Sequence, residues 1–154
     1  MSELERIGQL LRSVWNGPAW HGPAVWQVLE DVKAEDADRR VGGAHTMLEL
    51  VSHMAVWEEA VAFRIETGMA RVADKDNFGV PTGDDAWRVA IDRLRTAQNR
   101  LLEVISSLND MDLDRRIQGD DPEPHTLRFT LYGLVHHDLY HSGQIQILKR
   151  ALSK

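Results

Sequence analysis

The chain has 154 residues, of which 43% are hydrophobic and 27% charged, and this size and composition are typical of one globular domain. It contains no cysteine, which excludes disulfides, thiolate metal sites and cysteine nucleophiles. The 18 basic and 24 acidic residues give a net charge of −6, which argues against nucleic acid as a partner, and no apolar stretch of about 18 residues predicts a membrane span. We therefore expect a cytoplasmic, soluble protein with one domain over residues 1–154.

Glycines and prolines divide the sequence into long stretches in which apolar residues recur at helical spacing. The first stretch extends from about Ser2 to Trp15, and its charged start does not have the pattern of a signal peptide. After a break at 17–23, a shorter helix is expected from Pro23 to about Val32, because proline fits the first turn of a helix.

Three longer helices are expected in the rest of the chain. One begins at Thr46, where the sequence has the form of a capping box, and ends near Gly68. The next covers about 84–108, and the last covers about 126–154. No strand pattern is visible beside these helices.

The connection at about 69–83 is long for a helical bundle, in which helices are usually joined by about 2–8 residues. A connection of this length allows a crossover between the helices that it joins. The sequence therefore predicts an all-α fold, a four-helix bundle with a long connection between its second and third long helices.

The strongest functional signal is a pair of histidines four residues apart in the last predicted helix. His137 and His141 share one helix face with leucines that are expected in the core. A buried imidazole must satisfy two polar nitrogens, and a divalent metal ion can satisfy one of them. The alternative is a neighbouring carbonyl or carboxylate, since pairs with this spacing also occur by chance.

A third histidine, His53, lies at the edge of the apolar stripe of the second long helix. Two imidazoles from one helix and one from another can hold a metal ion and leave a position open for water or substrate. This donor set is typical of catalytic zinc, and it also suits nickel or iron.

Three further residues are candidates for the surroundings of this site. Trp57, one turn after His53, can form a wall of the metal pocket, although tryptophan at this spacing is more often part of the core. Gln144 lies near the face of His141 and can orient a ligand or a water molecule. His45 can approach the mouth of the site, but a solvated helix end is the simpler interpretation.

Several segments resemble the signatures of the DinB/YfiT-like family. HDLYHSGQI at 137–145 is similar to the motif of the family's closing helix. GAHTMLELVSH at 43–53, followed by Trp57 and Glu58, is similar to its second-helix motif, and WHGP at 20–23 resembles the segment after its first helix. These similarities occur in the family's order and cover essentially the whole chain.

The resemblance implies a four-helix bundle, usually dimeric, that holds one divalent metal ion per chain, with Zn, Ni and Fe all open as its identity. Position by position, the ligands fall on His53, His137 and His141. The family includes, or is related to, enzymes that transfer low-molecular-weight thiols such as bacillithiol, mycothiol or glutathione, but most members have no assigned reaction. A chain without cysteine agrees with a thiol brought in by the substrate.

We therefore expect a metal-dependent enzyme that transfers a low-molecular-weight thiol to an electrophilic small molecule. Two alternatives stay open, a hydrolase that uses metal-bound hydroxide and a non-catalytic binding or interaction domain whose helices the metal cross-links. No fourth ligand stands at helical spacing from the three histidines, which favours an open site, although Glu49, His45 or a loop carboxylate can still close it.

A homodimer is expected as well, partly from the resemblance. The last helix presents four residues away from the predicted metal face, and aromatic residues are enriched at protein interfaces. These residues are Tyr132, His136, Tyr140 and Ile147.

Overall fold

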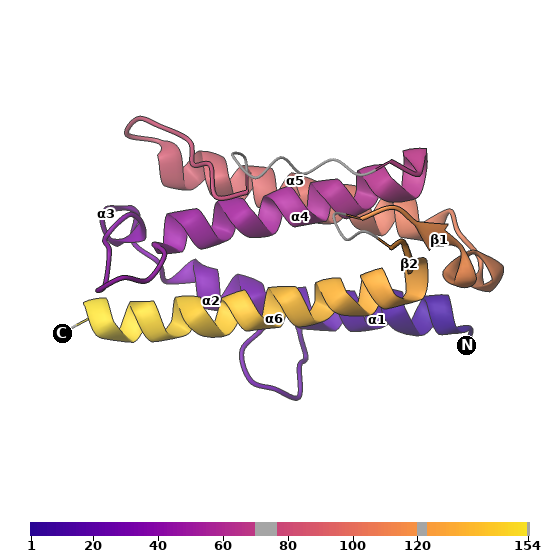
Figure 1. Cartoon of the computed structure of the whole chain (residues 1–154). Helices are drawn as coiled ribbons and strands as arrows, with labels where there is room; N and C mark the ends of the chain where they lie inside the picture. Colours follow the sequence, from indigo (N-terminus) through magenta and orange to yellow (C-terminus); the bar gives the residue numbers. More distant parts are fainter. Residues whose placement is uncertain (70–76, 120–122, 154) are drawn as a thin grey trace.

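In the computed structural model, which describes residues 1–69, 77–119 and 123–153, the chain is mostly helical (Figure 1). Four long helices form the bundle: α1 (Glu3–Asn16), α4 (Met47–Thr67), α5 (Ala86–Ser106) and α6 (Leu127–Leu152). Two short helices lie between α1 and α4: α2 (Val25–Glu30) and α3 (Ala34–Ala37). The all-α bundle predicted from the sequence is confirmed, and the helix bounds agree with the expected ones to within a few residues.

The long helices form two layers. Figure 1 shows α4 and α5 side by side in one layer, with α1 and α6 in the other. The connection between α4 and α5 is long, as expected, because α4 ends at Thr67 and α5 begins only at Ala86. Part of it, residues 70–76, lies outside the described residues. None of the helices that the structure describes has the length and apolar character that a membrane span requires.

The expectation that the chain has no strand is wrong at one place. A 3-10 helix, η2 (Asp110–Asp114), is followed by β1 (Arg116–Ile117), which pairs antiparallel with β2 (His125–Thr126) directly before α6. Ile117 lies opposite His125 in this pair. Strands of two residues are too short to produce an alternating sequence pattern, so periodicity could not reveal them.

α4 begins and ends at residues with clear capping roles. The Thr46 hydroxyl accepts the N–H of Glu49 at 3.1 Å, and the Glu49 carboxylate accepts the N–H of Thr46 at 2.9 Å, so the predicted capping box is confirmed. At the other end, Gly68 has φ 71°, a left-handed conformation that glycine adopts without strain. These local interactions fix the register of the helix that carries His53.

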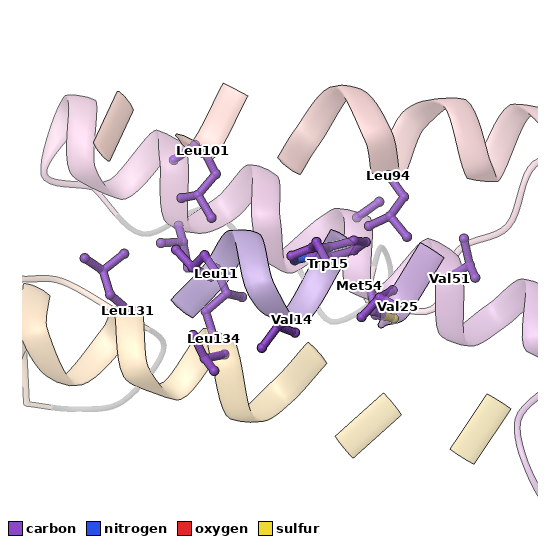
Figure 2. Packing of buried hydrophobic residues seen from close by; sticks show 14 of the residues in the cluster. Leu11, Val14, Trp15, Val25, Val51, Met54, Leu94, Leu101, Leu131 and Leu134 are labelled. Atoms are coloured by element: carbon purple, nitrogen blue, oxygen red, sulfur yellow. The ribbon is translucent and has the colours of Figure 1, made fainter. Parts of the chain in front are cut away.

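One hydrophobic core joins the helices, and Figure 2 shows part of it. Fifteen of the 21 residues of α4 are buried, so neighbouring elements cover this helix on most sides. In such a position a polar side chain must find a partner inside the protein. The buried polar side chains of α4 and α6 for which this question matters most include His53, Glu58, Asp138 and His141.

Candidate metal centre

Three imidazoles from two helices meet inside the bundle. His53 stands on α4, and His137 and His141 stand one turn apart on α6. The ring centroid of His53 is 4.9 Å from that of His137 and 4.7 Å from that of His141, and the α6 pair is 4.4 Å apart. One ligand nitrogen from each residue lies within 4.8 Å of the other two. The structure thus brings together the three residues that the sequence singled out.

Two of these imidazoles have a defined tautomer. His53 Nδ1 lies 2.9 Å from the backbone oxygen of Asn77, and His141 Nδ1 lies 2.8 Å from Gln144 Oε1. Because a carbonyl oxygen only accepts hydrogen bonds, each Nδ1 carries the proton and donates it. The Nε2 atom of each neutral ring therefore has a free lone pair.

His137 completes the group in a way that calls for a cation. Its Nε2 lies 3.0 Å from His53 Nε2, which carries a lone pair. A proton on His137 Nε2 would satisfy this contact, but it would leave the buried Nδ1 as an acceptor 3.5 Å from a carboxylate oxygen of Asp138. With the proton on Nδ1 instead, the lone pairs of His137 Nε2 and His53 Nε2 face each other. A cation bound by both nitrogens removes their repulsion.

The distances fit one shared divalent ion. Metal–nitrogen bonds of about 2.0–2.1 Å allow two ligand nitrogens to be at most about 4.2 Å apart. The contact between His53 and His137, at 3.0 Å, is already inside this limit, and since each ligand nitrogen lies within 4.8 Å of the other two, rotations of the side chains can bring all three to one ion. The donor set, three imidazoles without a thiolate, suits zinc, nickel or iron.

Burial keeps the rings of His53 and His141 neutral. It lowers the pKa of His141 to about 4, an effect that the hydrogen bond to Gln144 opposes and the nearby His137 reinforces. Burial also lowers the pKa of His53, against the hydrogen bond to Asn77. Since only an uncharged imidazole can bind a metal ion, both residues are available as ligands at neutral pH.

The connection before α5 covers the α4 side of the site. Asn77 accepts the N–H of His53 through its backbone oxygen and that of Trp57 through its side chain, at 3.0 Å. The Phe78 ring lies flat between two imidazoles, with centroids 4.1 Å from His53 and 3.9 Å from His45. Sequence analysis missed Asn77 and Phe78, because no spacing rule connects a residue in a long connection with a helix that ended earlier in the chain.

The other predicted residues have varied positions. Trp57 is half-buried beside both His53 and His137, with ring centroids 6.3 Å and 6.0 Å away. His45 is exposed at the start of α4, where its Nδ1 lies 2.9 Å from Glu49 Oε2. Neither His45 nor Glu49 belongs to the group of converging nitrogens.

A pocket of about 320 Å³ opens beside His137. α4, the β1–β2 pair and the first half of α6 provide its walls. Apolar and aromatic side chains make up much of the lining: Trp57, Val61, Ile117, Phe129 and Leu134. The pocket is therefore suited to a small molecule with an apolar surface.

Comparison with known families agrees with the geometry. Residues 20–145 match the family model of the DinB superfamily, and this range contains the three converging histidines. A comparison with curated proteins finds no match. Because the family match covers far more than half of the sequence, the chain belongs to the DinB superfamily.

Proposed function

We propose that the chain is a metal-dependent enzyme that transfers a low-molecular-weight thiol to an electrophilic small molecule. The observation that carries this proposal is the convergence of three imidazoles beside a pocket with a largely apolar wall. A divalent ion held there supplies a positive charge that favours the deprotonated form of a thiol or of water at its open position.

The ligands in this proposal are His53, His137 and His141, which would hold one ion per chain. Asn77 and Gln144 orient two of the rings by accepting hydrogen bonds from their Nδ1–H groups. In the part of the chain that the structure describes, the metal-binding group contains no fourth imidazole and no carboxylate. This supports a bound ion with one coordination position open to an exogenous ligand, as catalysis requires.

The pocket and the composition indicate what the two reactants are. The chain has no cysteine, so a thiol nucleophile must come from outside. The pocket beside His137 is near the lower end of the usual range for ligand sites, about 300–1,000 Å³. Trp57 and Phe129 in its wall favour an aromatic or otherwise apolar electrophile, which would lie next to the site where the thiol binds.

The test is an activity screen on the full chain purified without an affinity tag. Protein loaded with Zn²⁺, Ni²⁺ or Fe²⁺ is mixed with glutathione, bacillithiol or mycothiol and a panel of aromatic electrophiles, and thiol consumption is followed. We expect consumption with loaded protein and none above the free-metal background with stripped protein. Ester hydrolysis without any thiol would instead support the hydrolase, and a loaded protein inactive in both assays would support a non-catalytic metal-stabilised domain.

A pocket variant separates substrate binding from metal binding. Thr130 lines the pocket, and Thr130→Trp would fill it without changing a histidine. We expect this variant to keep one metal ion per chain but to lose at least about tenfold in kcat/KM, equivalent to about 1.4 kcal/mol. Thr96→Trp on the exposed side of α5 is the matched control. Full activity of Thr130→Trp would show that the electrophile binds elsewhere.

A further inference from the structure

A second pocket lies between α4 and α6, apart from the first pocket, which is the one beside His137. It has a volume of about 260 Å³. Its wall consists of residues 43–45 before α4, Leu50 of α4, and Gln144, Ile147 and Leu148 of α6. Among the residues that the structure describes, the two pockets have no wall residue in common.

The two pockets lie on opposite sides of the three histidines. Figure 1 shows that α4 and α6 run in opposite directions. Along α4, Leu50 of the second pocket precedes His53, and Val61 of the first pocket follows it. Along α6 the order is reversed, since the residues of the first pocket come before His141 and those of the second pocket come after it. The metal centre therefore separates the two pockets.

Two sets of contacts connect the wall of the second pocket with metal ligands. Gln144 accepts a hydrogen bond of 2.8 Å from His141. On the α4 side, the ring of His45 stacks on Phe78 at an interplanar angle of 3°, and Phe78 stacks on His53 at 2°. The second pocket thus adjoins the centre through His141 and His53, whereas the first pocket includes the third ligand in its wall.

The second pocket offers hydrogen-bonding groups of both kinds. The Gln144 Oε1 atom accepts from His141, so the Nε2 atom of the same amide keeps two N–H donors. His45 Nδ1 lies 2.9 Å from a carboxylate oxygen of Glu49, which accepts its proton in a hydrogen bond. In the neutral ring, His45 Nε2 is then an acceptor. Residues 43–45 are all exposed, so these groups are open to a molecule that enters from solvent.

The chemistry of the two walls matches the two reactants of the proposed reaction. Glutathione, bacillithiol and mycothiol each contain a cysteine unit, in which a short CH₂ arm carries the sulfur beside amide groups that form hydrogen bonds. Leu50 and Leu148 give the second pocket apolar surface for such an arm, next to its polar groups. The first pocket, with Trp57 and Phe129 in its wall, suits the apolar electrophile.

We propose that the second pocket binds the thiol, so that the thiol and the electrophile reach the metal centre from opposite sides. The sulfur then arrives beside His53 and His141, and the electrophile arrives beside His137. Because the two pockets are separate, both reactants are bound at the same time before they react. The inference rests on the proposed function, since it gives the thiol of that reaction its place.

Two glycines allow each pocket to be blocked by the same substitution. Gly43 lines the second pocket and Gly133 lines the first. A Cβ atom added at either glycine meets no neighbouring atom within 4 Å, so tryptophan can enter without strain at its first carbon. Ala151→Trp, at an exposed position in the last turn of α6, is the control. Elemental analysis should find one ion per chain in all three variants, and far-ultraviolet circular dichroism checks their folding.

The first measurement is calorimetric binding of the S-methyl derivatives of glutathione, bacillithiol and mycothiol to the metal-free, tag-free full chain. These probes keep the body of each thiol but cannot form a thiolate. We expect at least one of them to bind to the wild type, at least about tenfold more weakly to Gly43→Trp, and unchanged to Gly133→Trp and Ala151→Trp. A wild type that binds none of the three probes overturns the inference.

The second measurement is steady-state kinetics of the loaded protein with both reactants varied. Gly43→Trp should raise KM for the thiol at least about tenfold and leave KM for the electrophile unchanged, and Gly133→Trp should do the reverse. Double-reciprocal lines of the wild type should intersect, because both reactants are bound together. A wild-type KM for the thiol in Gly43→Trp overturns the inference while the proposed function stands. A wild type that consumes no thiol, but binds an S-methyl probe that Gly43→Trp excludes, overturns the proposed function while the pocket assignment stands.

Discussion

Adjacent histidines on α6 have different surroundings. His137 is half-buried and faces His53, whereas His136 is exposed. We expect His137→Ala and His141→Ala to lose stoichiometric metal binding, measured by elemental analysis of tag-free protein. They should also lose the stabilisation by excess metal, which is about 2.7 kcal/mol at 100 times Kd.

His136→Ala is the control for this prediction, because it changes the same residue type one position away. It should keep one ion per chain and the full rise in melting temperature with added metal. A variant set in which His136→Ala loses the metal and His137→Ala keeps it would contradict the proposed ligands.

Acid should destabilise the metal-free protein. The pKa of His141 is about 4 when folded and near its usual 6.5 when unfolded, and that of His53 is lowered in the same direction. Between these values the unfolded chain binds more protons than the folded one, so the free energy of unfolding falls as the pH decreases from 6.5 to about 4. Urea denaturation across this range measures the effect, and His141→Phe should flatten it.

Sequence reasoning at the residue scale succeeded where partners are close in the chain. The pair His137 and His141 follows from helical spacing, and so does Gln144, whose side chain meets His141 one turn away. Asn77 could not be predicted, because its contact with His53 depends on the path of a long connection.

The N-terminal cap of α4 stabilises the element that carries His53. Thr46 is buried, and its hydroxyl accepts the N–H of Glu49 and donates to Asp38 at 3.3 Å. We expect Thr46→Ala to lower the free energy of unfolding by about 0.5–2 kcal/mol, because the N–H loses its acceptor. Chemical denaturation of the metal-free protein measures this loss.

Two further variants are controls for the prediction on the helix cap. Thr46→Ser keeps the hydroxyl and should retain most of the stability. Thr96→Ala, in the exposed middle of α5, should be neutral or slightly stabilising because alanine is the better helix former. Equal losses in Thr46→Ala and Thr96→Ala would show that the cap has no special role.

Element boundaries were predictable where local chemistry sets them. The capping box at Thr46 and the left-handed Gly68 mark both ends of α4, and each is visible in the sequence. The pair β1–β2 was missed, because it exists through hydrogen bonds between segments that individually have no strand pattern. The pocket beside His137 was missed with it, since Ile117 and His125 form part of its wall.

At the scale of the whole molecule, apolar periodicity predicts a helical bundle but not which helices are neighbours. The structure pairs α4 with α5 and places α6 so that its inner face meets α4 at the histidines (Figure 1). The three proposed ligands and the residues that accept hydrogen bonds from two of them then come from α4, α6 or the connection that follows α4. The outer face of α6 is left for other contacts.

We propose that this outer face of α6 forms the contact between two copies of the chain. Tyr140 and Ile147 are 66% and 68% exposed, with His136 beside them, whereas Tyr132, which we expected on the same face, is half-buried against the core. Tyr140 and Ile147, two turns apart on one helix, give this face exposed apolar surface that suits a self-complementary interface. Multi-angle light scattering at micromolar concentration should therefore give twice the 17.5 kDa of one chain.

Tyr140→Glu combined with Ile147→Glu should give the monomer mass, and Val89→Glu, at an exposed apolar position of α5, should leave the dimer intact. A wild type with the monomer mass, or a double variant that remains dimeric, would rule out this interface.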